Sequence, residues 1–390
     1  MQLDVQAVVA AIARATRISG RALPLHEPLF AGREWDYLRQ CLDSGWVSSA
    51  GKFVDEFETR LAATCAVKHA VATVNGSAAL HAALHLVGVR PGDEVIVPAL
   101  TFVASANAVT YCGAVPHFVD SLERGFGMDA QKLSSHIASI TLRRDGELLN
   151  RETGRPIRAI VPVHVFGHPV EMDELNAVAA SFALPVVEDA TESLGSSYRG
   201  RPCGGLGSAG VLSFNGNKIV TTGGGGAILT NDESLARRAR HLTTTAKLPH
   251  AWSFVHDEVG WNYRLPNLNA ALGLAQLEQL GVFVAAKRAL ARRYADAFAG
   301  IKGLAWAEEP EGTCSNYWLN AVLLDDDGGA ARDAVLRATH EAGYLTRPVW
   351  TLMHRLNMFR DCPRADLSTA ESIERRLVNL PSSAVLGAHG

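Results

Sequence analysis

The sequence predicts an α/β fold, with a large domain built on a mostly parallel sheet and a smaller C-terminal α+β domain. Three observations support this prediction. From about residue 70, short apolar runs alternate with helical patterns, as in repeated β-α-β units. The 25 residues from Val95 to Val119 contain no Asp, Glu, Lys or Arg, which is typical of the buried middle of a parallel sheet. After about Leu265, long helical patterns replace this alternation.

The composition fits a globular protein and argues against several other classes. The chain has 390 residues, 47% of them hydrophobic, so it can bury a large core. Lys+Arg total 37 and Asp+Glu 40, and this balance predicts neither nucleic acid nor an anionic membrane as a partner. The six cysteines are scattered and show no zinc spacing, which indicates reduced thiols and a cytoplasmic protein. Asp4 argues against a signal peptide.

The N-terminal residues predict an amphipathic helix of their own. Val5, Val8, Val9 and Ile12 recur at i, i+3, i+4 and i+7, and Gly20 follows the pattern. We therefore expect a helix over residues 3–18. The predicted organisation is an N-terminal helix in residues 1–20, a large cofactor-binding domain in 21–265 and a small domain in 266–390.

In the large domain, apolar runs bounded by turn residues predict strands at residues 70–74, 94–97, 115–119, 159–165, 185–188, 210–214 and 226–230. Helical spacing between them predicts helices at residues 78–87, 102–112 and 171–182. In the small domain the same signals predict helices at residues 267–280, 285–298 and 328–342 and a strand at 318–324.

Chemically distinctive residues follow several of these strands, at the sheet edge where open α/β folds bind ligands. Asn75-Gly76-Ser77 follows the first strand and opens a helix, whose free N–H groups suit a phosphate. Phe102 follows the next strand and offers an aromatic face, while Asp189 and Lys218 follow two later strands. An anion cradle, a stacking ring, an acid and a lysine together predict a site for pyridoxal phosphate.

The same segments resemble a known family. Glu188-Asp189-Ala190, the run from Ser213 through Lys218 to Gly226, and Trp261-Asn262-Tyr263-Arg264-Leu265-Pro266 are similar to motifs of the DegT/StrS-type sugar aminotransferases. The resemblance extends from about Leu23 to Ser383 and implies the aspartate-aminotransferase-like fold, called fold type I. Residues 315–320, 347–350 and 379–383 resemble the branch that aminates C-4 of nucleotide-linked 4-keto-6-deoxy sugars.

The resemblance implies a role for each matching residue. Lys218 would hold the cofactor as a Schiff base and then move a proton at the reacting carbon, and Asp189 would pair with the pyridine nitrogen. The other implied cofactor contacts are Gly76, Ser77, Phe102, Glu192, Ser213 and Asn262. Asn262 would reach the phosphate of a neighbouring subunit, which implies a homodimer with shared active sites.

Position 192 departs from the family pattern. Many relatives carry Gln or His there, near the phenolic oxygen of the cofactor. A glutamate at this position would repel that oxygen unless it is protonated or turned away. Glu192 is nevertheless predicted to be a cofactor contact.

Candidate substrate contacts lie mainly in the C-terminal motifs. They are Trp46, Asn316, Tyr317, Arg347, Trp350 and His354. Arg347 and Lys247 are also candidates for the two phosphates of a nucleotide, because basic side chains match phosphate oxygens. No metal is predicted: His81 and His85 are four residues apart on a predicted helix, but no Glu follows His81.

The predicted reaction moves an amino group from a donor, by resemblance L-glutamate, to a nucleotide-linked 4-keto-6-deoxy sugar. The nucleotide is left open among UDP, GDP and dTDP. One alternative is a sugar dehydratase of the same fold, in which His replaces the lysine at position 218. A second is a non-catalytic sensor, which would not need Lys218 and Asp189 together. A third, a dinucleotide-binding dehydrogenase, is disfavoured because the Gly-rich stretch 205–210 precedes a strand instead of following one.

Overall fold

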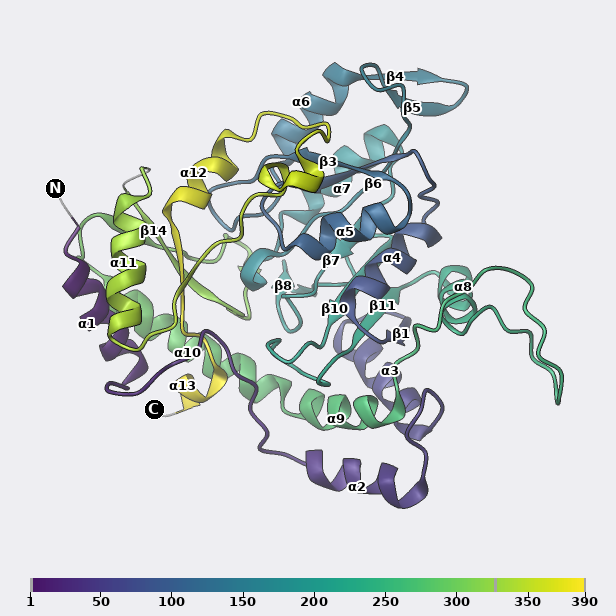
Figure 1. Ribbon diagram of the computed structural model, residues 1–390, viewed down its shortest axis with the longest axis horizontal. Helices are drawn as coiled ribbons and strands as arrows, with labels where there is room; N and C mark the ends of the chain where they lie inside the picture. The colour runs from purple at the N-terminus through teal and green to yellow at the C-terminus, as the bar shows by residue number, and fades with distance from the viewer. Residues whose placement is uncertain (1–2, 326–327, 389–390) are drawn as a thin grey trace.

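Two sheets that continue into one another form the centre of the computed structural model, which describes residues 3–325 and 328–388 (Figure 1). The first sheet has the order β1 (His69–Thr73), β11 (Gly226–Thr230), β10 (Ala209–Ser213) and β7 (Val187–Asp189). The second has the order β3 (Val115–Val119), β2 (Glu94–Pro98) and β6 (Ile157–Ile160). Parallel bridges from Ile160 to Val186 and from Val163 to Asp189 join them. Among these strands, β11 alone runs antiparallel to its neighbours, so the predicted mostly parallel sheet is confirmed.

The strand predicted at residues 159–165 is wrong beyond Ile160. β6 ends at Ile160, and Val165–Gly167 forms a 3₁₀ turn, η1, in which Phe166 has a φ of 57°. Gly167 follows at a φ of 92°, and a Cβ there would collide with the side chain of Asn316. The apolar run continues past the strand because the turn itself is buried.

Helices cover both faces of the central layer (Figure 1). The helices between residues 34 and 243 are α2 (Glu34–Ser44), α3 (Lys52–Thr64), α4 (Gly76–Leu86), α5 (Val103–Tyr111), α6 (Ala130–Ile140), α7 (Met172–Phe182) and α8 (Glu233–Thr243). Short strands form two further sheets, β4 (Thr141–Arg144) with β5 (Glu147–Asn150), and β13 (Thr313–Cys314) with β8 (Ser197–Tyr198) and β9 (Arg201–Pro202).

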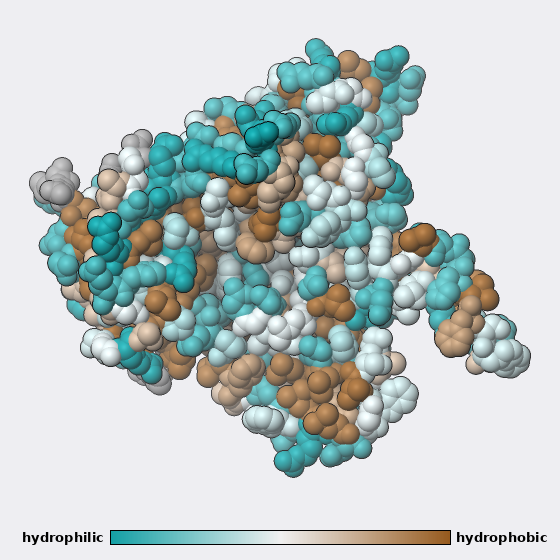
Figure 2. Space-filling view, viewed as in Figure 1, coloured by the Kyte–Doolittle hydropathy of each residue, from teal (hydrophilic) through white to brown (hydrophobic). Residues whose placement is uncertain are grey.

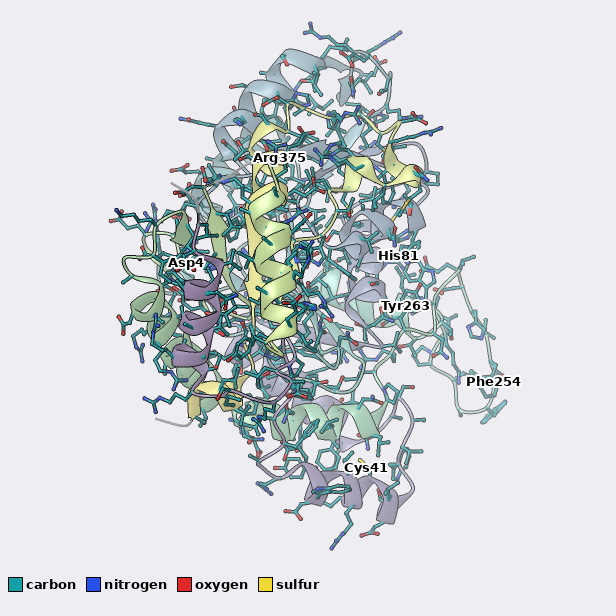
Figure 3. All side chains as sticks on the ribbon, turned by 60° about the vertical axis from the view of Figure 1, so that its left-hand side comes forward. Asp4, Cys41, His81, Phe254, Tyr263 and Arg375 are labelled. Carbon is teal, nitrogen blue, oxygen red and sulfur yellow. The ribbon has the colours of Figure 1, made fainter. Side chains whose placement is uncertain are left out.

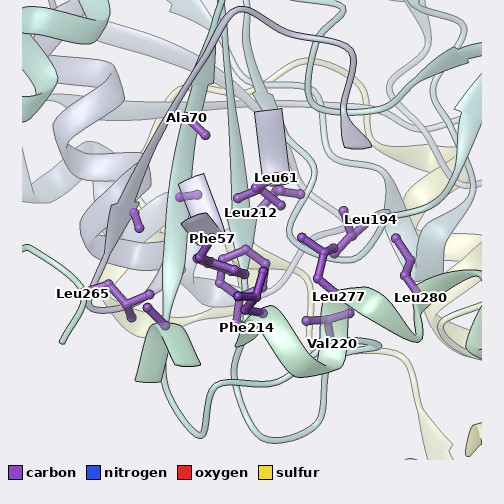
Figure 4. Packing of buried hydrophobic residues seen from close by; sticks show 14 of the residues in the cluster. Phe57, Leu61, Ala70, Leu194, Leu212, Phe214, Val220, Leu265, Leu277 and Leu280 are labelled. Atoms are coloured by element: carbon purple, nitrogen blue, oxygen red, sulfur yellow. The ribbon is translucent and has the colours of Figure 1, made fainter. Parts of the chain in front are cut away.

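One core cluster lies between the large sheet and the helix pair α3 and α9 (Asn267–Glu278) (Figure 4). Phe57 of α3 meets Phe214, which directly follows β10, edge to face, with their ring centroids 5.2 Å apart. Leu212 and Leu277 belong to the same buried cluster. This packing fixes the end of β10, from which the chain turns toward Lys218.

The C-terminal part contains an antiparallel sheet of its own. Its order is β12 (Leu304–Trp306), β14 (Asn320–Leu324), β16 (Leu377–Leu380) and β15 (Arg347–Pro348). The helices around it are α10 (Leu280–Phe298), α11 (Ala330–Glu341), α12 (Ser368–Arg376) and α13 (Ala384–Ala388), with the turns η2 (Met353–Arg355) and η3 (Asn357–Phe359). The N-terminal helix α1 (Val5–Thr16) packs on α10 and α11, while α9 packs on α2 and α3. The domain limits at residues 20 and 265 stay a prediction.

In residues 3–325 and 328–388, no single helix is long and apolar enough to cross a bilayer. Within those residues, α9 and α10 are long and apolar enough only as a pair, and the two helices meet at a bend of 57°.

Lys287 of α10 is buried where this helix meets two other segments. Its Nζ donates a hydrogen bond to the carbonyl of Trp318 at 3.1 Å and another to the carbonyl of Ser382. Burial lowers the pKa of this lysine to about 7. The amine is shielded from solvent as long as the chain is folded.

An arm, residues 244–262, projects from the body between α8 and α9 (Figures 1 and 3). Bridges from Thr244 to Asn262 and from Lys247 to His256 pair its two sides. Large apolar side chains of the arm are exposed, with Trp252 at 81% and Phe254 at 77%. A second exposed apolar set lies on and beside α2; its members are Phe30, Trp35, Leu42, Trp46 and Val47. In Figure 2, brown surface is visible along the arm and at the lower end of the body.

Candidate active site

A cavity of about 300 Å³ lies beside the carboxyl ends of β7 and β10 and the first turn of α4. Seven of the eight residues that the sequence predicts as cofactor contacts line it: Gly76, Ser77, Phe102, Asp189, Glu192, Ser213 and Lys218. Trp350, a candidate substrate contact, also lines the cavity, and so does Trp318. The sequence analysis did not single out Trp318, although it lies inside the quoted motif 315–320.

The cradle predicted for an anion is formed by the start of α4 and the end of β10. Asn75 caps the helix, its side chain accepting a hydrogen bond from the N–H of Ala78 at 2.7 Å. A Cβ at Gly76 would lie 2.9 Å from Cβ of Ser213, so only glycine allows this close approach. The N–H groups of a first helical turn have no partners inside the helix and lie at its positive dipole end. This donor set fits the phosphate of pyridoxal phosphate.

Asp189 is the last residue of β7, and hydrogen bonds hold its carboxyl group at the wall of the cavity. The residue is 3% exposed, and its Oδ2 accepts a hydrogen bond from the hydroxyl of Ser105 at 2.7 Å. Its Oδ1 accepts another from the N–H of Thr191 at 3.2 Å. Ser105 Oγ lies 2.9 Å from Thr101 Oγ1. A fixed, nearly dry carboxylate is the group that a protonated pyridine nitrogen requires.

Lys218 extends into the cavity between a carboxylate and an aromatic ring. Its Nζ lies 3.3 Å from Oε1 of Glu192 and 3.9 Å from the ring centroid of Trp318. The other oxygen of Glu192 accepts a hydrogen bond from the N–H of Phe166 at 2.8 Å. Burial raises the pKa of Glu192, and the positive charge of Lys218 opposes that rise. A raised pKa favours the protonated form, which is one of the two ways in which a glutamate can lie beside a phenolic oxygen without repelling it.

Two aromatic side chains form an apolar wall of the cavity. Phe102 is 52% exposed, and its ring centroid lies 6.2 Å from that of Trp350. Trp350 in turn packs on Phe166, with the centroids 5.2 Å apart. The open ring of Phe102 leaves room for a flat group to stack on it.

The remaining predicted contacts do not line the cavity in the described part of a single chain. They are Asn262, Trp46, Asn316, Tyr317, Arg347 and His354. Asn262 and Trp46 are exposed, and Arg347 lies near His340 on the surface, with 3.2 Å between Arg347 Nη1 and His340 Nε2. Their direct contact with cofactor or substrate stays a prediction.

Asn316 and Tyr317 are both buried, behind the cavity. The amide of Asn316 donates to the carbonyls of Glu192 and Leu194 at 3.0 and 2.9 Å, and its oxygen accepts from the N–H of Trp318 at 2.7 Å. The hydroxyl of Tyr317 accepts from the N–H of Glu309 at 3.3 Å. Asn316 thus links the backbone of Glu192 to that of Trp318, and both of these residues line the cavity. The sequence motif did not indicate this structural role.

His164, Glu188 and Cys203 form a buried cluster with ligand atoms near enough for a metal ion, and Glu188 directly precedes Asp189 in the chain. Nδ1 of His164 accepts a hydrogen bond from the N–H of Val170 at 2.9 Å, so the ring proton is on Nε2. That proton is donated to Glu188 at 2.8 Å. Glu188 also accepts from the N–H of Leu206 at 2.8 Å. The geometry is therefore that of a hydrogen-bonded support for β7.

His81 and His85 contact an aromatic ring at the base of the arm. Their ring centroids lie 4.7 and 5.2 Å from that of Trp261. His81 is also 3.3 Å from the hydroxyl of Tyr263, as measured from its Nδ1 (Figure 3). Both histidines therefore help to anchor the arm on α4.

Known proteins resemble this chain over nearly its whole length. The model of the DegT/DnrJ/EryC1/StrS aminotransferase family matches residues 30–389. The chain is 40% identical to a GDP-perosamine synthase of Caulobacter vibrioides over 360 residues, 92% of each chain. It is 36% identical to a GDP-perosamine synthase of Escherichia coli O157:H7 over 363 residues, 92% of this chain and 93% of the other. The crystal structure of DesI with its TDP-sugar product aligns with a TM-score of 0.82 at 29% identity, covering 96% of this chain and 91% of that chain.

Proposed function

This chain belongs to the DegT/DnrJ/EryC1/StrS aminotransferase family, as its motifs predict, and from this premise we propose that it aminates C-4 of a nucleotide-linked 4-keto-6-deoxy sugar. The amino donor is L-glutamate. The nucleotide is guanosine diphosphate, because both curated relatives described above carry GDP in their names. The observation that supports the proposal most strongly is the single cavity lined by Lys218, Asp189 and the cradle at Gly76.

The residues that line the cavity have different chemical roles in the proposed reaction. Pyridoxal phosphate, when bound, supplies an aldehyde that takes up the amino group and a ring that accepts an electron pair from the reacting carbon. The cradle at Gly76 and Ser213 binds the phosphate, and Asp189 keeps a negative charge at the ring nitrogen. Lys218 binds the cofactor covalently through Nζ and moves a proton to and from the reacting carbon.

The apolar wall suits the proposed sugar. A 6-deoxy sugar has a methyl group where other hexoses carry a hydroxymethyl group. Phe102 and Trp350 offer that methyl group an apolar surface beside the cavity. Transfer of one methyl group from water to such a surface contributes about 0.8 kcal/mol.

The proposal includes a cytoplasmic location. The six cysteines of the chain are free thiols in the structure, as the sequence predicts. The reducing conditions of the cytoplasm keep thiols in that state.

We also infer that the active unit is a homodimer with shared sites. Asn262 is exposed at the base of the arm and lies outside the cavity of its own chain. The exposed side chains of the arm include Trp252 and Phe254, and contiguous exposed apolar surface marks interaction sites. A second copy of the chain, receiving the arm beside its own cavity, would bury these side chains and bring Asn262 to the cradle.

Complementation between two impaired variants tests the shared site, at a cofactor concentration that saturates the wild type but not Asn262→Ala. We expect wild-type protein to sediment at twice 41.7 kDa. Asn262→Ala will weaken pyridoxal phosphate binding by about tenfold, the effect of one lost hydrogen bond to a charged group. Refolding this variant together with Lys218→Ala will restore part of the activity, because one site of the mixed dimer then has both residues intact. A fully active monomer, or no gain on mixing, would contradict shared sites.

The acceptor is tested by removing the nucleotide. We expect kcat/KM for the GDP-linked 4-keto-6-deoxy sugar to exceed that for the free sugar by at least about 10³-fold, because remote binding energy positions the reacting carbon. UDP- and dTDP-linked sugars serve as matched acceptors, and mass spectrometry of the product distinguishes amination from the loss of water by a dehydratase. Equal values with and without the nucleotide, or a preference for a 2-oxo acid, would contradict the proposal and leave the cofactor assignment intact.

A further inference from the structure

The amine of Lys218 has two neighbours that both favour a positive charge. Oε1 of Glu192 lies 3.3 Å from Nζ, and the ring centroid of Trp318 lies 3.9 Å from it. A carboxylate attracts an ammonium by Coulomb's law, and an indole ring attracts it through its negative face. The side chain of Lys218 is only 13% exposed, so water screens these contacts weakly.

We propose that Glu192 and Trp318 form a resting site that holds Lys218 as an ammonium in the cofactor-free enzyme. The inference deepens the proposed function, on which it rests for the role of Lys218. The ammonium carries a full charge and three N–H groups, whereas a nitrogen bonded to the cofactor keeps at most one N–H. The two contacts therefore favour the unbonded lysine over the bonded one.

The resting site is built before Lys218 enters it. Oε2 of Glu192 is fixed by the N–H of Phe166 in the η1 turn. The indole N–H of Trp318 donates to the carbonyl of Asn217 at 2.7 Å. Asn316 connects the two halves, since its amide binds the carbonyl of Glu192 and the N–H of Trp318. Asn316 is thus a positioning residue for the site.

The surroundings of Glu192 shift its pKa in both directions. Burial raises the pKa of Glu192, and the negative charge of Asp189 adds to that rise. The charge of Lys218 and the hydrogen bond from Phe166 oppose it. The ammonium of Lys218 thus opposes protonation of Glu192, and the carboxylate form of Glu192 in turn attracts the ammonium.

Methylation of lysines in the cofactor-free full chain tests the resting site. A short pulse of formaldehyde and cyanoborohydride methylates only uncharged, accessible amines, and mass spectrometry measures the rate at each lysine. Lys132, paired with Asp120 at 2.6 Å and 43% exposed, is the internal reference. Lys287, which is fully buried, reports unfolding. We expect Glu192→Gln to raise the rate at Lys218 relative to Lys132 by about three- to tenfold, because the glutamine keeps the shape but loses the charge.

Glu171→Gln, at the start of α7, is the matched control and should leave the ratio unchanged. An unchanged ratio in Glu192→Gln would overturn the proposal. If Lys287 is also methylated, the Glu192→Gln variant has partly unfolded, and Trp318→Leu, which keeps Glu192, is tested instead. In Trp318→Leu, a raised ratio supports the resting site and an unchanged ratio overturns it. No sugar is present, so failure here is distinct from failure of the acceptor test.

Discussion

Replacing Lys218 by alanine will reduce amino transfer by at least about 10³-fold, since both covalent binding of the cofactor and proton movement at the reacting carbon depend on this amine. Among the described residues that line the cavity, Lys218 is the only lysine. The measurement is kcat for amination of the nucleotide-linked keto sugar with L-glutamate as donor. Borohydride treatment followed by mass spectrometry should detect covalently attached pyridoxal phosphate in wild-type protein and not in the variant.

The fold should survive this change. Lys218 lies beyond the end of β10 and contributes no apolar side chain to the core. Lys68→Ala is the matched control, because Lys68 is exposed just before the amino end of β1, at the opposite end of the strand from the cradle. Its turnover should equal that of the wild type. Turnover by Lys218→Ala comparable to that of the control would contradict the assigned role.

The central strands could be predicted because their sequences have local signals. The segment from Val115 to Val119 is apolar between turn residues, and it forms β3 over those same residues. The run from Ala159 to Val165 has the same signal but bends after Ile160. The cause of that bend is tertiary, because Gly167 packs on Asn316, which is distant in the chain. No local pattern contains that information.

Some helices and strands that were not predicted do have a recognisable sequence pattern. Phe53, Phe57 and Leu61 of α3 recur at helical spacing and are all buried. Asp145-Gly146 separates β4 from β5, and both residues adopt positive φ angles, as a two-residue hairpin turn requires. These elements could have been predicted from the sequence with the same rules.

The same distinction between local and tertiary signals applies to the residues of the candidate site. Asp189, Ser213 and the cradle at Gly76 could be located because each lies at the end of a strand or the start of a helix. The contact between Lys218 and Trp318 joins residues far apart in the chain, so it depends on how the C-terminal part packs against the sheet. Asn316 illustrates the limit of motif reasoning, since its amide is engaged with backbone groups behind the cavity.

Replacing Asp189 by asparagine will slow amino transfer by about 10²- to 10³-fold, the typical cost of removing one fixed charge or donor from an active site. Asparagine keeps the size of the side chain but loses the negative charge at the ring nitrogen, so the ring accepts the electron pair less readily. Binding of pyridoxal phosphate should weaken by less than about tenfold, because the phosphate cradle at Gly76 and Ser213 is untouched. The two effects are separated by measuring kcat at saturating cofactor and the dissociation constant by titration.

Ser105→Ala distinguishes the charge of Asp189 from its orientation. The hydroxyl of Ser105 donates to Oδ2 of Asp189 at 2.7 Å, so the alanine removes one hydrogen bond and keeps the charge. Transfer by this variant should fall by about tenfold, the lower end of what the loss of one hydrogen bond to a charged group causes (about 1.5–3 kcal/mol), because Thr191 still holds the other oxygen. If Asp189→Asn transfers as fast as Ser105→Ala, orientation and not charge is what Asp189 supplies. If Asp189→Asn is as fast as the wild type, another group must hold the proton on the ring nitrogen.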